Sequence, residues 1–144
     1  MNHAGTDRVT PDRATSNRAI SPPSLPAPLA RYSHGILVPA GAQLLVTSGQ
    51  LGVGRDDIIP DDVEAQAVLC FENIKAILTE AGMTFADVIR FNAFVTDRSY
   101  FPIYGEVRNR YVAGDAFAST LVIVSGFTRP EFKVEVEVTA ARVE

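Results

Sequence analysis

A chain of 144 residues, 47% of them hydrophobic, has enough apolar side chains for one core and too little length for two. One cysteine and two histidines exclude a disulfide framework and a typical zinc site, so we predict chemistry without a metal or other cofactor. The net charge of -4 argues against a nucleic-acid partner, because phosphate binding requires clustered Lys and Arg.

The N-terminal segment is polar and charged, and we expect residues 1–18 to form a disordered tail before a single domain at residues 19–144. The tail lacks the apolar run of a signal peptide, and no later segment has the ~20 apolar residues of a membrane helix. These features predict a cytoplasmic protein without a membrane partner. Four prolines between Ile20 and Leu29 predict an extended arm, because proline cannot donate to a strand ladder.

The next segments predict two strands and a helix. Tyr32–Val38 and Leu44–Ser48 flank a five-residue connection that contains a glycine, a pattern typical of a hairpin. Apolar residues at spacings of three and four predict a helix over Asp61–Ala81, with an aspartate as its N-cap and Gly82 after its end. Cys70 lies on the apolar stripe of this helix, which indicates an inert core thiol.

Alternation predicts a third strand over Val88–Thr96, and a second helix follows over Tyr100–Val112. The inner face of this second helix is expected to contain Tyr104, Val107 and Tyr111. Its charged residues are interpreted as a solvated face, formed by Glu106, Arg108 and Arg110.

The stretch Gly114–Glu137 predicts two strands joined by a turn at the centre of the sheet. Ser119–Ser125 is apolar on both faces, and Phe132–Ala141 alternates. The resulting order ββαβαββ defines an α+β fold with both helices on one face of a single mixed sheet. Because Leu121 to Val124 are apolar on both faces, the uncovered face should contact a second copy of the chain.

From about Ile20 to Glu144 the chain resembles the RidA family, also called the YjgF/YER057c family or endoribonuclease L-PSP. The matching segments are Tyr32-Ser33, Val46-Thr47-Ser48-Gly49-Gln50, Glu72 to Leu78 with Ala81-Gly82, Phe94-Val95-Thr96-Asp97 and Lys133 to Glu137. The resemblance implies a chorismate-mutase-like fold and a homotrimer with ligand clefts between subunits. It also implies hydrolysis of small reactive enamines and imines to a 2-keto acid and ammonia.

The resemblance assigns roles to residues of this chain. Glu135 would position the attacking water, while Tyr32 and the backbone of Ser48-Gly49 would line the cleft. The family arginine that grips the substrate carboxylate aligns with Ser119, in Phe117-Ala118-Ser119-Thr120, and a frequent cysteine aligns with Leu121. A neutral hydroxyl cannot replace a charge-assisted bidentate pair, so we expect altered activity.

Each candidate also fits a structural role. Ser119 and Thr120 are candidates for hydrogen bonds to a ligand or to local backbone. Tyr32 and Phe127 are candidates for a pocket wall or for the core. Glu135 shares a strand face with Lys133 and Glu137, which is also typical of a solvated face. The replacement cation for the missing arginine has two candidates, Arg129 in the last turn and Arg110 on the second helix.

Three functions follow from these observations. The first hypothesis is a RidA-like deaminase-type hydrolase that acts on small reactive imine or enamine metabolites. The alternative is a non-catalytic trimer that binds a small metabolite, suggested by the neutral side chain at position 119. A ribonuclease or translation inhibitor rests only on the family's older name, and the acidic charge balance counts against it.

Overall fold

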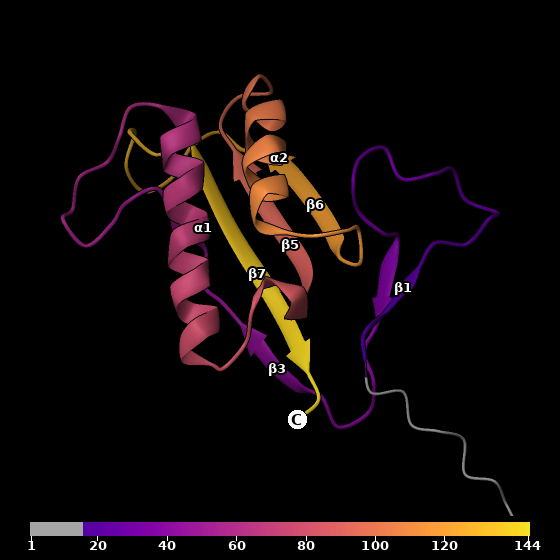
Figure 1. Ribbon diagram of the computed structural model, residues 1–144. Helices are drawn as coiled ribbons and strands as arrows, with labels where there is room; N and C mark the ends of the chain where they lie inside the picture. Colours follow the sequence, from indigo (N-terminus) through magenta and orange to yellow (C-terminus); the bar gives the residue numbers. More distant parts are fainter. Residues whose placement is uncertain (1–15) are drawn as a thin grey trace, which may run out of the picture.

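The structure is a computed structural model that describes residues 16–144 (Figure 1). Residues 1–15, most of the predicted tail, lie outside the described residues. The remaining part of that tail belongs to the fold, because the Asn17 side chain donates to the Ala141 carbonyl at 2.9 Å. Arg18 begins the first strand, so the domain starts earlier than residue 19.

The described residues form two α-helices, a short 3-10 helix and seven strands. In chain order these elements are β1 (Arg18–Ile20), β2 (Gly35–Leu37), β3 (Gln43–Val46), β4 (Gln50–Leu51), α1 (Val63–Glu80), η1 (Phe85–Asp87), β5 (Val88–Val95), α2 (Tyr100–Tyr111), β6 (Ala118–Ile123) and β7 (Val134–Arg142). Both helices end within two residues of their predicted bounds. The Asp62 carboxylate accepts from the Ala65 amide and caps α1, as predicted.

The main sheet has the strand order β3-β7-β5-β6, and β4 also pairs with β7. Strand β6 runs parallel to β5 because the chain crosses over through α2, and the other pairs are antiparallel. The prediction that Gly114–Glu137 forms the centre of the sheet is therefore correct for β7 and wrong for β6. Within this chain, β6 is an edge strand whose one partner is β5.

The predicted hairpin between Tyr32–Val38 and Leu44–Ser48 is wrong. Strand β2 pairs with β1 in a separate two-stranded sheet, which stands apart from the main sheet in Figure 1. Strand β3 pairs instead with the end of β7, where Leu44 lies opposite Ala141. The Pro-rich arm connects β1 to β2 and places Tyr32 beside the main domain.

Helices α1 and α2 lie side by side over one face of the main sheet (Figure 1). Alternate β7 residues are buried beneath them, namely Val134, Val136, Val138 and Ala140. The Phe71 ring from α1 stacks on Tyr111 of α2 at a centroid distance of 5.1 Å and lies 6.0 Å from Tyr104. These contacts confirm the predicted α+β fold with both helices on one face.

On the opposite sheet face, here called the open face, residues 16–144 place no second layer of helices. Its exposed apolar side chains are Leu44, Val46 and Val122, and Val46 is 72% exposed. Beside them Arg90 donates to Asn92 at 2.8 Å, and Asn92 donates to the Glu137 carboxylate at 3.0 Å. An apolar patch next to ordered polar groups is typical of a surface that contacts another protein chain.

One buried side chain ties α1 to the start of β7. The Gln66 amide nitrogen donates to the Pro60 and Glu131 carbonyls at 2.8 Å each, and its oxygen accepts from the Lys133 amide at 2.8 Å. Buried polar groups are costly unless they are paired, and here the amide is satisfied at both ends. This contact fixes the entry of β7, which carries Glu135.

Candidate functional site

Ser119 faces the helix side of the sheet. It lies opposite Phe91 in the parallel β5–β6 register, and Phe91 is fully buried under the helices. Thr120 lies opposite Asn92 and therefore points to the open face, where its hydroxyl accepts from Arg90 at 3.5 Å. The two adjacent hydroxyl residues thus serve different surfaces, and Ser119 alone can contact α2.

Arg108 of α2 is the residue that meets Ser119. Its Nη1 donates to the Ser119 hydroxyl at 3.0 Å, and its Nη2 donates to the Arg31 carbonyl at 3.1 Å. The guanidinium carbon lies 5.0 Å from the centre of the Phe117 ring, and the residue is only 4% exposed. The prediction that Arg108 belongs to a solvated helix face is therefore wrong.

The environment of Arg108 is unusual for a charged side chain. None of the ion pairs among residues 16–144 includes it, so no carboxylate of the described chain neutralises its charge. Desolvation by burial lowers the pKa of Arg108, an effect that Tyr104 opposes and Arg31 reinforces. The burial of Arg108 could have been predicted from its spacing in the sequence, because it lies one turn after Tyr104, on the buried side of α2.

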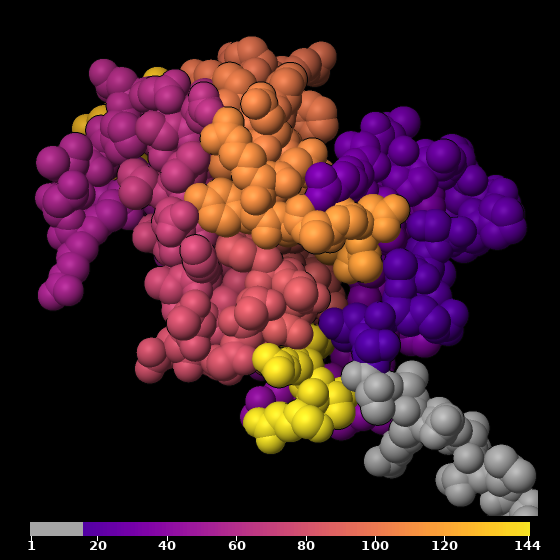
Figure 2. Space-filling model, in the orientation of Figure 1, coloured from indigo at the N-terminus to yellow at the C-terminus, as the bar shows by residue number. Residues whose placement is uncertain are grey.

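A cavity of about 630 Å³ opens beside this pair. It contains three of the residues assigned to the site from the sequence, namely Tyr32, Ser119 and Leu121, together with Arg108. Its other lining residues come from the Pro-rich arm, α2 and the end of β6: Leu29, Ala30, Arg98, Phe101, Pro102, Gly105, Glu106, Asn109 and Ile123. In Figure 2 the indigo N-terminal arm stands against the orange α2 and β6 region. We call this cavity the arginine pocket.

The arm is held at the pocket by hydrogen bonds. The Arg31 side chain donates to the Gly114 carbonyl at 2.6 Å and to the Val112 carbonyl at 2.5 Å. Ser33 donates from its backbone amide to the Phe117 carbonyl at 2.8 Å. Tyr32, between these two anchored residues, lies at the pocket wall. Its hydroxyl accepts from the Leu29 amide at 3.3 Å.

Glu135 and Gly49 meet on the open face. A Cβ at Gly49 would lie 1.8 Å from the Glu135 Oε1, so the carboxylate rests against the glycine backbone. Ser48, the neighbour of Gly49, is exposed, and its carbonyl accepts from Gln50 at 3.3 Å. Partial burial of the carboxyl, with a smaller contribution from Glu137, raises the pKa of Glu135. The predicted grouping of Ser48-Gly49 with Glu135 is present in the structure.

Ser119 and Glu135 lie on opposite faces of the sheet. In the strand register Ser119 aligns with buried Phe91, whereas Glu135 aligns with Phe94, whose side chain points the other way. The residues assigned from the sequence therefore form two half-sites within one chain: the arginine pocket on the helix side, and Glu135 with Gly49 on the open face.

Three predicted residues lie away from the arginine pocket. Arg129 pairs with Glu131 at 3.6 Å and stands over the Phe132 ring, and Phe127 lies beside them in the β6–β7 turn. Arg110 pairs with Glu64 of α1 at 2.5 Å. Neither arginine proposed as the replacement cation contacts Ser119, and the side chain that does is Arg108.

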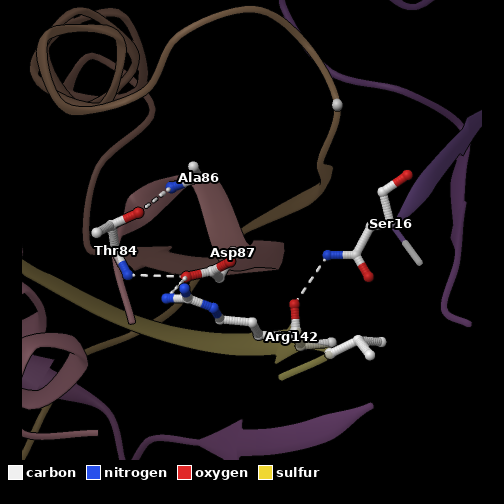
Figure 3. Close-up of a pocket in the computed structure, with 9 residues that line it drawn as sticks. Ser16, Thr84, Ala86, Asp87 and Arg142 are labelled. Carbon is white, nitrogen blue, oxygen red and sulfur yellow. Dashed lines mark hydrogen bonds and ion pairs between the residues drawn. The ribbon is translucent and has the colours of Figure 1, made fainter. Parts of the chain in front are cut away.

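A second polar cavity, of about 540 Å³, lies where the N-terminal segment meets the end of β7 (Figure 3). Most of its polar groups are committed to local structure: Thr84 and Asp87 form a reciprocal cap on η1, and Arg142 lies 3.9 Å from Asp87. The Asn17 side-chain oxygen is the exception, since it is buried without a partner in the described residues.

Other chemistry has weaker candidates. Burial raises the pKa of the Cys70 thiol to about 12, which agrees with the predicted inert core thiol. The described residues contain no cluster of three or more His, Cys, Asp or Glu that would hold a metal ion. No helix in residues 16–144 is long and apolar enough to cross a membrane.

These observations define the class of protein. It is a small α+β domain whose sheet is covered by helices on one face, with a buried arginine in a pocket at the sheet edge and a carboxylate on the open face. Residues 23–142 match the family model described as endoribonuclease L-PSP. The chain belongs to this family, whose members also carry the names RidA and YjgF.

Three relatives illustrate the similarity. Protein DfrA of Myxococcus xanthus is 34% identical over 130 residues, which cover 89% of this chain and 98% of that protein. The 2-iminobutanoate/2-iminopropanoate deaminase of Escherichia coli is 26% identical over 129 residues, covering 88% and 98%. The crystal structure of Escherichia coli TdcF with bound serine is 32% identical, with a TM-score of 0.64, and the match covers 88% of this chain and 99% of that one.

Proposed function

We propose that this protein is a cytoplasmic homotrimeric hydrolase that converts small 2-imino acids or their enamine tautomers to 2-keto acids and ammonia. The proposal rests on family membership and on relatives that are described as deaminases of iminobutanoate and of reactive intermediates. The observation that carries it is the Glu135 carboxylate against Gly49, partly buried and with a raised pKa. A carboxylate whose pKa is raised holds a proton more readily, as a group that takes and returns a proton must.

In the proposed reaction the Glu135 carboxylate accepts a proton from water as the water oxygen attacks the C=N carbon. The new C–O bond forms while the nitrogen takes a proton from solvent, which gives a carbinolamine. Glu135 then returns its proton to the nitrogen, the C–N bond breaks, and ammonia leaves. The C=O bond forms as the carbinolamine hydroxyl gives its proton back to solvent. The balance is one imine and one water to one ketone and one ammonia, without oxidation or reduction.

The proposed trimer would bring the two half-sites together. Within one chain the sheet itself separates the arginine pocket from Glu135. Contact between the open face of one copy, with its exposed Val46 and Leu44, and the β6 edge of another would place Glu135 beside that copy's arginine pocket. Multi-angle light scattering should then give about three times the 15.5 kDa mass of the chain.

The hydrolysis is tested with a freshly generated 2-imino acid, whose disappearance is followed with and without the purified protein. Glu135→Gln should lower the rate on the order of 10²-fold or more, because it removes the proton acceptor without a change in size. Glu80→Gln, an exposed carboxylate at the end of α1, is the matched control and should leave the rate unchanged. Equal rates for wild type and Glu135→Gln would contradict the proposal.

A non-catalytic binding trimer is the second candidate, and the composition of the arginine pocket favours it. The carboxylate that lines this pocket, Glu106, lies 3.6 Å from Arg110, and Glu135 is on the other face. Within one chain the pocket therefore has no unpaired carboxylate that could take a proton from water. Such a protein would bind the 2-keto acid product without accelerating its formation. If the protein binds the 2-keto acid but hydrolyses no imine, the non-catalytic binding function is supported over the hydrolase.

A further inference from the structure

The arginine pocket contains the buried Arg108 guanidinium, which has more N–H donors than the described chain uses. A guanidinium carries five N–H groups: one on Nε and two on each Nη. Asn109 Oδ1 accepts from Nε at 3.3 Å and from Nη2 at 3.2 Å, and the Arg31 carbonyl takes the other Nη2 hydrogen. Nη1 donates one hydrogen to Ser119, and none of the hydrogen bonds within residues 16–144 uses its second hydrogen, although the Tyr104 side chain lies near the guanidinium.

Ser119 supplies the second donor. Its hydroxyl oxygen accepts from Arg108, so its own hydrogen is free to donate. The Nη1 and Oγ atoms are 3.0 Å apart, and both residues line the cavity. Two donors at this separation, one of them cationic, match the two oxygens of a single carboxylate.

The charge around the guanidinium also requires an anion. Among the charged residues at the pocket, Arg98 is a second cation, and Glu106 already has Arg110 as a partner. Arg31, whose carbonyl contacts Arg108, adds positive charge of its own. A buried charge without a counter-charge is costly, and a bound carboxylate would offset that cost.

Part of the remaining cavity wall is apolar. Phe101 of α2 and Ile123 at the end of β6 are both exposed large hydrophobic residues, and Leu29 of the arm is almost fully exposed. Leu121 lies two residues after Ser119 on the same side of β6. Ligand sites combine apolar walls with a few convergent polar groups, and this cavity has that composition.

We propose that Arg108 and Ser119 together form the carboxylate anchor of the arginine pocket, and that the pocket takes monocarboxylates with a branched aliphatic or aromatic side chain. The anchor cation thus comes from helix α2 rather than from strand β6. The inference rests on the proposed function for the reacting group and assigns its substrate class: 2-imino acids with a sizeable apolar side chain.

The anchor is tested by calorimetric titration of the full chain with 3-phenylpropanoate and with 3-phenylpropanamide, which differ in the carboxylate alone. The acid should bind roughly 10-fold or more tightly than the amide, since it gains a charge-assisted pair. Arg108→Gln should remove this acid–amide difference. Arg110→Gln, an exposed arginine two residues along the same helix, should leave both affinities unchanged.

A structural role for Arg108 would give a different result, because a damaged pocket would weaken acid and amide binding equally. Where Arg108→Gln fails to fold, Ser119→Ala replaces it, since Ser119 is only partly buried on an edge strand. That variant should lose roughly 3- to 10-fold of the acid affinity and none of the amide affinity. Equal binding of acid and amide by the wild type, or unchanged acid affinity in both variants, would overturn the anchor.

The proposed function and the anchor fail separately. Glu135→Gln should lower the rate of hydrolysis by the factor given above, while the affinity for 3-phenylpropanoate stays at the wild-type value. A wild-type protein that prefers the acid to the amide but hydrolyses no imine would refute the proposed function and retain the anchor. A protein that hydrolyses imines with the same KM in wild type and Ser119→Ala would retain the function and refute the anchor.

Discussion

The Glu135 carboxylate rests against the backbone of Gly49, so closely that a methyl group at position 49 would lie 1.8 Å from Oε1. The carboxylate would have to move to make room for that methyl group, because real Cβ atoms do not approach an oxygen so closely. Strand β4 follows Gly49 directly and pairs with β7 opposite Glu135 itself. The glycine and the carboxylate are therefore held in register by the sheet.

Replacement of this glycine should impair the reaction more than the fold. We expect Gly49→Ala to lower kcat/KM for imine hydrolysis on the order of 10²-fold, because small displacements of a catalytic group carry such losses. Gly126→Ala, at a glycine with open space around it and no positive φ, is the control and should retain full activity. Full activity of Gly49→Ala in steady-state assays would show that the Glu135 position is not critical.

The raised pKa of Glu135 predicts a pH dependence. Activity should rise with pH through the pKa of Glu135, because only the ionised carboxylate accepts a proton from water. Partial burial is the main cause of the raised pKa and Glu137 contributes second, so Glu137→Gln should shift the midpoint of the pH–rate profile to lower pH. An unchanged midpoint would mean that another group controls the profile.

The same raised pKa has a consequence for stability. The folded state binds a proton at Glu135 more tightly than the unfolded state, so ionisation of this group destabilises the fold. The penalty is absent below the unfolded-state pKa and fully present above the raised pKa of the folded state. Glu135→Gln should therefore gain stability relative to wild type as pH rises through that window, as measured by urea unfolding at several pH values.

The three hydrogen bonds of the buried Gln66 side chain predict a large loss of folding stability when this residue, which lies outside the site, is replaced. Gln66→Leu would leave the Pro60 and Glu131 carbonyls and the Lys133 amide without their partner. We expect a loss of roughly 2–4 kcal/mol in the free energy of unfolding, since buried unpaired groups cost about 1–3 kcal/mol each and water recovers part. Gln43→Leu, at an exposed glutamine of β3, should change it by less than about 0.5 kcal/mol.

The open face predicts which substitution would disrupt the proposed trimer. Val46→Lys should dissociate it, because a charge would be buried at an apolar contact. Ile58→Lys is matched in exposure, 64% against 72% for Val46, but lies in the loop before α1 and should leave the trimer intact. Light scattering measures both outcomes. A trimeric Val46→Lys protein would place the subunit contact elsewhere.

Local features of the sequence predicted local features of the fold. Helix α1 follows from its apolar spacing and from the Asp62 cap, both of which lie within the helix itself. The pairing of β2 could not be predicted in this way, because its partner Arg18–Ile20 lies at the border between the predicted tail and the predicted Pro-rich arm. The edge position of β6 depends on its crossover through α2, which an alternation pattern does not reveal.

The candidate site shows the same limit. Glu135 and the Ser48-Gly49 pair were assigned from the family resemblance, and the structure places them together. Arg108 was missed because charge suggests solvent, whereas its position one turn after buried Tyr104 brings it under the arm and against Ser119. The helical spacing places Arg108 on the buried side of α2, and the contact between α2 and β6 pairs it with Ser119, whereas Arg110 pairs with Glu64.

The separation of Ser119 and Glu135 by the thickness of the sheet has a consequence for how the proposed enzyme behaves in dilute solution. A reaction centre divided between copies exists only while those copies are associated, so specific activity should fall as the protein is diluted below its dissociation constant. Two impaired variants, Arg108→Gln and Glu135→Gln, should then restore part of each other's activity when their subunits are exchanged. Each defect would be compensated by the intact half-site of a neighbouring chain.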